Sequence, residues 1–468
     1  MDLLESSECQ SGVAQGPGTQ ASTERREPID CSGRIAVRAF ARGSRSCGAK
    51  GGLRVSSANG SGWVALLLLL LVPGCAPQEQ APPAVATAEP VELRVALFNI
   101  RELAEGKLPS VDRGADLAIE AAVRIVRRVR PDVLVVQEID QGPDDDPAAV
   151  ARAFAALLAD TSLEVDEQPL DFSHVFAGLS NTGRLSGVDL DGDGHVATVD
   201  DRGSRAHGGD SFGFGTYPGQ YSMAVLSRFP LDTDGLRSFR RLLWKDLPGA
   251  LIDGAELPPG ASEVFRVSSK SHWDLPLLLA PGDGAGPDRN LHLLVSHPTP
   301  PGFDGPEDRN GRRNFDELRL WVEYLRPGVR LPEDSGTALD YTRPDGSVPP
   351  FVVVGDLNAR PDTEESIYDG KAAIAQLLEH PWIQESGPLL VSDGGIEAAS
   401  EAPSKQYPER STAVFGDGMR IDYLLPSRDL EMVSGGVYWP SSTDDPEGAE
   451  LAERASDHRL IWLDLVVP

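Results

Sequence analysis

Residues 131–138 read PDVLVVQE: a proline, then an apolar run that ends in a carboxylate. The preceding residues, 114–130, place apolar side chains at helical spacing. Because a proline disfavours helical backbone at the residue before it, we expect the helix to end at Pro131. A buried strand should follow over 132–138. A helix that leads directly into a buried strand is typical of an α/β fold.

The same alternation extends outward from this stretch and indicates one catalytic domain over residues 92–468. Further strands are expected at 93–98, 221–228, 264–269, 291–296, 351–355, 420–425 and 460–466, and further helices at 147–159, 313–326 and 371–379. Residues 178–219 are a Gly/Asp-rich insertion, and 327–349 and 440–455 have the composition of loops.

Polar side chains stand where these apolar runs stop. They are Asn99, Glu138, His297, Asp356, Asn358, Asp422, Asp457 and His458. Loops at one edge of a sheet can gather such groups into a single site. The set contains hard oxygen ligands for Mg²⁺ and imidazoles for proton transfer. Taken singly each has a plainer interpretation: Asp356 and Asn358, for example, are also typical turn residues.

Six stretches carry a more specific signal. They are FNIRE (98–102), PDVLVVQEID (131–140), SHPTP (296–300), GDLNARPD (355–362), RIDYLLPS (420–427) and SDHRLIW (456–462). In their order and spacing they resemble the endonuclease/exonuclease/phosphatase superfamily, which includes deoxyribonuclease I. The resemblance implies a four-layer α/β/β/α sandwich of two mainly antiparallel sheets flanked by helices. It also implies a metal-dependent hydrolase acting on phosphoester bonds.

The resemblance further implies how the metal and the water are held. Glu138 would bind Mg²⁺ or Mn²⁺, with Asn99 and Asp457 close to the ion, and Asp356 would orient and activate the attacking water. The residues after Asn99 depart from the aspartate that some nucleases carry nearby. Whether a second metal binds therefore stays open; Glu102 could substitute as its ligand.

The remaining implied roles concern the phosphorus. Asn358 and His297 would hold the non-bridging oxygens and stabilise the transition state. His458 would act as electrophile or base, with Asp422 fixing its tautomer.

Residues 189–201, DLDGDGHVATVDD, resemble a calcium loop of the EF-hand type. Asp189, Asp191 and Asp193 stand at loop positions 1, 3 and 5, His195 would offer a carbonyl at position 7, and Asp200 closes the loop at position 12. The expected role of Ca²⁺ is structural. The alternative is an acidic, solvated turn.

Four basic residues are candidates for substrate binding. Lys270 lies in an otherwise apolar segment, and Arg309, Arg312 and Arg313 follow His297 closely. Arginine suits bidentate recognition of phosphate. The alternative is surface ion pairing with the acidic residues beside them.

The N-terminal region predicts export. All four cysteines, Cys9, Cys31, Cys47 and Cys75, lie in the first 75 residues, an N-terminal extension with a lipoprotein-type signal. Residues 63–72, WVALLLLLLV, are too few to span a bilayer but fit a secretory signal. Val72 to Cys75 resemble a lipobox, so we expect a lipidated Cys75 on the periplasmic or extracellular face of a membrane. Residues 76–91 would be a flexible Pro/Ala tether.

The net charge of the chain disfavours nucleic acids as substrates. The chain of 468 residues carries a formal net charge of −29, which repels polyanions at long range. The sequence therefore predicts an exported, monomeric phosphoesterase acting on small or lipid-linked substrates. An extracellular deoxyribonuclease-like nuclease is the first alternative, and a non-catalytic binding lipoprotein on the same fold is the second.

Overall fold

The computed structural model describes residues 89–104, 106–108, 116–163, 165–280, 289–343, 345–362, 370–399, 407–416 and 418–468. The predicted N-terminal extension with its signal, and the tether up to residue 88, lie outside the described residues. Within the described ranges, no helix is both long enough and apolar enough to cross a bilayer.

The first sheet has six strands. Their order is β12 (Glu431–Val437), β13 (Ile461–Val467), β1 (Val91–Leu103), β2 (Val133–Ile139), β4 (Ser222–Ser227) and β3 (His174–Phe176). Only β1 and β2 pair in parallel, with Val95 opposite Val133, and the other pairs are antiparallel. The register of β1 and β2 shifts after Asn99, at the end of the sheet that carries the site.

The second sheet has five strands. Their order is β11 (Asp422–Pro426), β10 (Phe351–Asp356), β7 (Arg289–Ser296), β6 (His272–Ala280) and β5 (Arg237–Ser238). Here β7 and β10 are parallel and the other pairs antiparallel. A separate two-stranded ribbon joins β8 (Leu331–Pro332) to β9 (Ala338–Leu339).

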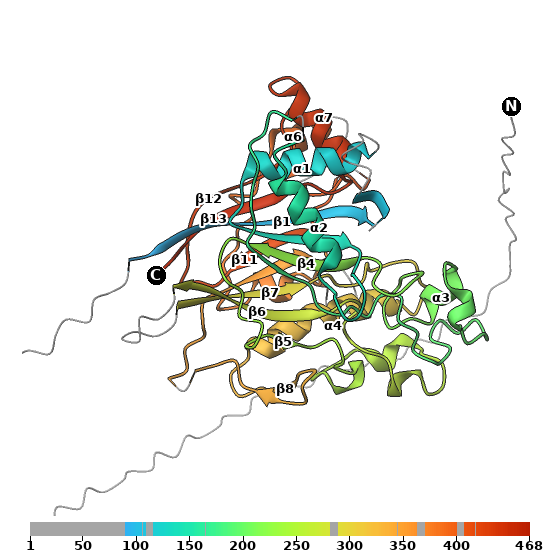
Figure 1. Ribbon diagram of the computed structural model, residues 1–468. Coiled ribbons are helices and arrows are strands. Elements are labelled where there is room, and N and C mark those ends of the chain that lie inside the picture. The colour runs from blue at the N-terminus through green and yellow to red at the C-terminus, as the bar shows by residue number, and fades with distance from the viewer. Residues whose placement is uncertain are drawn as a thin grey trace, which may run out of the picture. The chain divides into compact units, whose positions relative to one another are not determined.

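Helices cover the outer face of each sheet, as Figure 1 shows. The helices are α1 (Leu117–Val129), α2 (Ala149–Ala159), α3 (Arg205–Gly209), α4 (Arg309–Leu325), α5 (Ala375–Leu378), α6 (Asp393–Ala398) and α7 (Pro446–Ala455). Short 3₁₀ turns occur at Val199–Asp201, Trp244–Asp246, Ile252–Ala255, Ala261–Glu263 and Pro408–Arg410.

Three apolar cores separate four layers, which confirms the predicted sandwich. Between the sheets, alternate residues such as Val135 of β2 and Val354 of β10 share one core. The neighbouring residues point outward, so Leu134 packs toward α1 and α2, and Val353 packs toward α4. This alternation is the period of two that β-strands impose.

Helix α1 shows why the opening prediction holds. Asp116 caps its start by accepting hydrogen bonds from the amides of Ala118 and Ile119, both at 3.1 Å. The helix ends at Val129, where Arg130 turns into the left-handed region before Pro131. Its outer face carries Arg124 and Arg128, which both bind the carboxylate of Glu167.

Several predicted elements differ from the structure. The strand predicted at 264–269 is absent, and β6 begins later, at His272. Residues 265–267 pair with 242–244 through a single antiparallel bridge, Leu243 opposite Arg266, and Ser268 O accepts from the side chain of Asn181. This pairing is too short to make a strand.

Two more elements were misread in type or extent. Residues 446–455 form α7 inside a predicted loop, because Asp445 caps the amide of Gly448 and Pro446 suits the first helical turn. The helix predicted at 371–379 shrinks to the single turn of α5. Strand β12 had not been predicted.

Candidate active site

Most of the predicted catalytic and metal-binding side chains meet at one cavity of about 990 Å³. It lies at the end of the sandwich where β2, β7 and β10 finish. Glu138 belongs to the end of β2, His297 follows β7, and Asp356 ends β10. Asp457 and His458 enter from the segment between α7 and β13. The lining also includes Asn358.

Asp356 is the centre of the site. Its Oδ2 lies 3.1 Å from Asn99 Nδ2, 3.5 Å from His297 Nε2 and 3.7 Å from His458 Nε2. Its Oδ1 accepts the backbone amide of Asn358 at 2.9 Å. Burial alone would raise the pKa of this carboxyl group. The charge of His458 and the hydrogen bond from His297 outweigh that effect and lower the pKa below its usual range.

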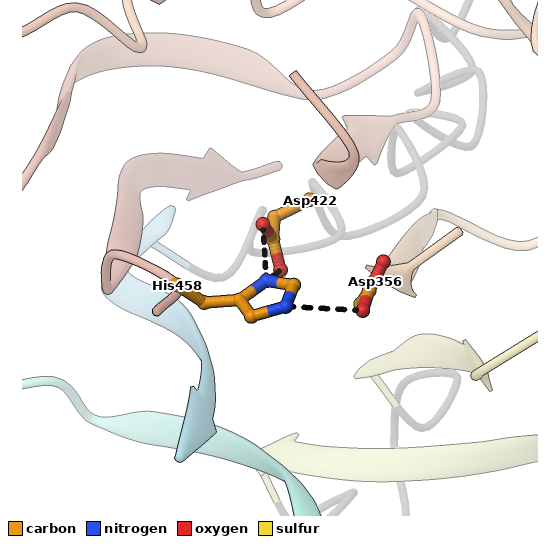
Figure 2. A group of neighbouring side chains, drawn as sticks. All are labelled: Asp356, Asp422 and His458. Carbon is orange, nitrogen blue, oxygen red and sulfur yellow. Dashed lines mark hydrogen bonds and ion pairs between the residues drawn. The ribbon is translucent and has the colours of Figure 1, made fainter. Parts of the chain in front are cut away.

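His458 lies between two carboxylates, as Figure 2 shows. Its Nδ1 is 3.0 Å from Asp422 Oδ2, and its Nε2 faces Asp356. Burial lowers the pKa of His458, but the two carboxylates overcome it and raise that pKa to about 10. The pKa of Asp422 is raised to about 6, by burial and, more weakly, by the charge of Asp356, against the opposing charge of His458. At neutral pH the arrangement is thus an imidazolium between two ionised carboxylates.

These three side chains also form a group of potential metal ligands, with ligand atoms within 4.8 Å of one another. The contacts between the ring nitrogen Nδ1 and Asp422 are at hydrogen-bond distance, 3.0 and 3.2 Å. A proton shared along this line satisfies all three groups. We therefore interpret the group as a hydrogen-bonded chain.

Gln137 fixes Asp356 against the other sheet, and the sequence analysis did not single it out. Its side chain is fully buried, donates to Ser296 O at 2.8 Å and accepts the amide of Asp356 at 2.7 Å. It thereby ties β2 in one sheet to β7 and β10 in the other. The available signal was a polar residue within the apolar run of 132–138.

Ser456 plays a similar positioning part beside His458. Its hydroxyl donates to Asn99 O at 2.8 Å and accepts the amide of His458 at 3.0 Å. These bonds join the segment before β13 to β1. They hold the imidazole beside the edge that carries Asn99.

The proposed metal ligands offer a set of hard oxygens. Glu138 adopts a left-handed backbone conformation, with φ 59°, at the end of β2, and its Oε1 accepts Asn99 Nδ2 at 3.1 Å. Asp457 pairs at 3.4 Å with Arg101, whose side chain is 65% exposed. An exposed arginine can move away at little cost. Two carboxylates and an amide oxygen suit Mg²⁺. Glu102, the substitute considered for a second metal, accepts the Tyr221 hydroxyl at 2.6 Å.

The four basic candidates separate into two groups. Lys270 lines the cavity beside the candidate catalytic residues, and its ammonium donates to Pro298 O at 3.3 Å. Burial lowers its pKa. Arg309 also lines the cavity, with one guanidinium nitrogen 2.7 Å from Leu190 O.

The other two arginines serve the fold. Arg313 touches the cavity, but its guanidinium is engaged by the backbone carbonyls of Val267, Phe212 and Arg266. Arg312 does not line the cavity and donates to Glu307 O at 2.9 Å.

The predicted calcium loop brings together a different ligand set. Asp189 and Asp191 lie within 4.8 Å of Asp210, a buried residue that the sequence analysis did not include. Asp193 and Asp200 are outside this group. The carboxylate of Asp193 accepts the amide of His195 at 2.7 Å, and the ring of His195 lies 3.2 Å from Asp201.

The group around Asp210 is built by backbone donors. Asp210 accepts the amides of Leu190 and Ala197, at 2.7 and 2.6 Å, so it closes the loop from ten residues beyond the expected last position. Burial and the neighbouring carboxylates raise the pKa of Asp191, although the amide of Asp193 opposes this. Mutual repulsion of that kind is what a bound cation relieves.

Comparison with known proteins places the chain in a family. A sequence profile described as "Endonuclease/Exonuclease/phosphatase family" matches residues 96–458. No curated protein sequence matches the chain.

Several solved structures are similar to the chain at low sequence identity. An endonuclease/exonuclease/phosphatase from Beutenbergia cavernae DSM 12333 is 20% identical, with 80% of this chain and 72% of that one covered and a TM-score of 0.44. The human Nocturnin catalytic domain is 15% identical, with 80% and 93% covered and a TM-score of 0.40. A mannosyl-6-phosphatase from Bacteroides thetaiotaomicron VPI-5482 is 12% identical, with 80% and 99% covered and a TM-score of 0.37. The family profile matches most strands of both sheets and all the catalytic candidates, so the chain belongs to the endonuclease/exonuclease/phosphatase family and is a metal-dependent hydrolase of phosphoester bonds.

Proposed function

We propose that the chain hydrolyses small or lipid-linked phosphoesters by direct attack of a water molecule that Asp356 orients. The observation that carries this proposal is the position of Asp356 Oδ2, which lies within 3.7 Å of three nitrogen atoms, from Asn99, His297 and His458. A carboxylate held ionised at the wall of a cavity can accept a hydrogen bond from the water and orient it for attack.

The other groups suit the charge that develops on the phosphate. His458, held as an imidazolium by Asp422, places a positive hydrogen-bond donor at the cavity. His297 is neutral, because burial and the charge of Lys270 lower its pKa. Its Nε2–H faces Asp356 and helps to keep that carboxylate ionised, while its Nδ1 is buried without a hydrogen-bond partner in the described structure. Asn358 and Lys270 add further donors along the same wall.

Glu138, Asn99 and Asp457 would hold the divalent ion, Mg²⁺ or Mn²⁺. When bound, such an ion withdraws charge from a phosphate oxygen as the water attacks. The protein's own part is to keep Glu138 and Asp457 at the cavity wall, with the buried Asn99 bonded to Glu138, and to keep Asp356 ionised.

The size and charge of the molecule support the substrate class. A cavity of about 990 Å³ is at the upper end of what small-molecule sites need. The net charge of −29 opposes the approach of a nucleic acid strand. A phosphate on a small or amphiphilic molecule carries less charge and meets Lys270 and Arg309 within the cavity.

We further propose that the chain is exported and anchored through a lipidated Cys75, as residues 63–75 indicate. Calcium is abundant outside cells, and we propose that Asp189, Asp191 and Asp210 bind it as a structural ion.

A hydrolysis panel with Mg²⁺ tests the proposed function. It covers bis-p-nitrophenyl phosphate, p-nitrophenyl phosphate, inositol phosphates, phospholipids and plasmid DNA, with Asp356→Asn and a chelator as controls. Hydrolysis of small or lipid phosphoesters that both controls abolish is expected. Faster cleavage of plasmid DNA than of every other substrate would establish the nuclease alternative. A folded, Mg²⁺-binding chain that cleaves nothing would favour the binding lipoprotein.

A further inference from the structure

The mouth of the cavity carries three exposed phenylalanines. Among the described residues, Phe214, Phe303 and Phe415 are the phenylalanines with large exposed fractions, 53%, 89% and 40%, and all three line the catalytic cavity. They come from three separate segments of the chain. Pro300 and Pro301 line the same cavity. Exposed apolar side chains that gather at one place mark a binding surface more often than scattered ones do.

Phe415 lies directly beside the reaction centre. Its ring contacts the imidazole of His458 edge-on, with the ring centroids 5.5 Å apart and the planes at 77°. A group that packs on Phe415 is therefore adjacent to a phosphate bound at His458. The apolar surface and the hydrolytic groups belong to one continuous site.

Phe303 is held in an unfavourable conformation. Its φ of 65° lies in the left-handed region, which a bulky side chain rarely adopts. The side chain is 89% exposed, so its packing within the fold offsets little of that strain. Strain that persists without a packing reason points to a functional one.

The ring of Phe214 lies against Gly208, where any larger residue would collide with it. A Cβ atom placed on Gly208 would lie 2.6 Å from Phe214 Cε2, so the ring rests against the backbone of α3. Gly208 and Arg205 of this short helix also line the cavity. The Gly/Asp-rich insertion thus contributes an apolar ring to the mouth.

We propose that these three phenylalanines bind the apolar chain of an amphiphilic phosphoester whose head group enters the catalytic cavity. This rests on the proposed function and names its substrate class. An almost fully exposed ring projects from the cavity wall and gains burial only against a second apolar body. The chain of the substrate, with the chains around it in a lipid aggregate, supplies that body.

The charge of the protein separates this occupant from a nucleic acid. Aromatic rings also stack on bases, but strand-binding surfaces combine them with a basic groove. Here the cavity lining mixes basic residues with Glu102, Glu138, Asp191, Asp356 and Asp457. The net charge of −29 adds long-range repulsion of a polyanion.

Matched esters of different chain length test the proposal. The substrates are p-nitrophenyl butyl phosphate and p-nitrophenyl octyl phosphate, with butyl and octyl phosphate as the monoester pair, all below their micelle-forming concentrations. Each fully buried methylene is worth about fourfold. Since burial will be partial, we expect kcat/KM to be at least about tenfold higher for the octyl ester than for the butyl ester. Phe303→Ala and Phe214→Ala should each reduce this ratio about threefold or more.

The matched control is Val433→Ala, which removes an exposed apolar side chain, 56% exposed, from β12 outside the cavity lining. It should keep the wild-type ratio. An equal kcat/KM for butyl and octyl esters, or an unchanged ratio in both phenylalanine variants, would overturn the proposal. The proposal would also be overturned if the wild-type chain preferred p-nitrophenyl thymidine 5′-phosphate to the octyl ester and Phe303→Ala removed that preference. The rings would then bind a nucleobase and not an apolar chain.

Failure of the proposed function is recognised separately. If no ester is hydrolysed by the wild-type chain, calorimetric titration of octyl and butyl phosphate into it still measures the affinity ratio. The proposal stands if octyl phosphate binds at least about tenfold more tightly and Phe303→Ala removes the difference. It fails if the two affinities are equal.

Discussion

The pairing of Asp422 with His458 gives the sharpest prediction, because the two residues are 36 positions apart and meet only through the fold. At 3.0 Å, in a medium of effective dielectric constant about 20, their charges interact by about 5.5 kcal/mol, equivalent to about 10⁴ in rate. This is an upper bound for the effect of removing the charge of Asp422. Asp422→Asn keeps a hydrogen-bonding group, so we expect a fall in kcat of about 10². His458→Ala removes the imidazole itself and should lower kcat by about 10⁴.

The double variant distinguishes a catalytic pair from two independent residues. If Asp422 acts only through His458, the double variant should fall by about 10⁴, no further than His458→Ala alone. If Asp422 instead acts on turnover independently of His458, the two effects multiply to about 10⁶. Steady-state kcat is measured for all four proteins with the substrate that the panel identifies, at a temperature where thermal melting shows each to be folded. A double variant at the product of the single effects would refute the pairing.

Three further predictions concern the two cation sites and the stability of the fold. Glu138→Gln keeps the shape of the side chain but removes a charge from the proposed Mg²⁺ site. Activity should therefore fall at least about 10²-fold while the melting temperature stays unchanged. Unaltered turnover would remove Glu138 from the mechanism. Calcium at about 100 times its Kd should stabilise the wild-type chain by about 2.7 kcal/mol and so raise its melting temperature. Asp191→Ala should lose most of that rise. If the variant responds to calcium as the wild-type chain does, the loop is only an acidic turn. Burial opposes ionisation of Glu167, but hydrogen bonds from Arg124 and Arg128 overcome it and lower its pKa to about 2 from 4.5. The side chain of Glu167 is 7% exposed. Because its pKa is lower in the folded state than in the unfolded state, its ionised form contributes at most about 3 kcal/mol to the free energy of unfolding. This contribution is complete above about pH 4.5 and is lost as the pH falls toward about 2. Glu167→Gln should therefore unfold more easily in urea at pH 7 but not at pH 2, and a difference that persists at pH 2 would contradict the charge argument.

The sequence predicts the strands of this fold best where both faces are buried. The runs that end at Glu138 and Asp356 are almost entirely apolar because β2 and β10 are covered on both sides, with Gln137 the exception in β2. The polar residue that ends each run therefore marks the sheet edge, and the site residues near it were predictable. Local composition fails where tertiary contacts take over the backbone. Residues 264–269 have strand-like composition, yet they pair with residues 242–244 through one bridge only, and the side chain of Asn181 takes the carbonyl of Ser268.

Contacts between distant segments could not be predicted from spacing. Gln137 looks like an interruption of an apolar strand, and its role appears only when Ser296 and Asp356 lie on either side of it. Asp210 lies beyond the expected end of the calcium loop and joins Asp189 and Asp191 through the fold of the insertion. A fixed loop template counts positions along one segment, so it assigns the closing ligand to Asp200 and misses a carboxylate supplied from outside the loop.

The hydrogen bonds of Asn99 bear on how the metal and the water can share one site. Its amide nitrogen has two hydrogens, and these go to Glu138 Oε1 and Asp356 Oδ2, both at 3.1 Å. Its oxygen accepts the amide of Arg101 at 3.1 Å and keeps one lone pair. The amide stands between the two carboxylates and donates a hydrogen bond to each, which offsets part of their mutual repulsion. Asn99 therefore acts first as a spacer between Glu138 and Asp356. Its remaining lone pair lets it contribute an oxygen to a metal without giving up either carboxylate.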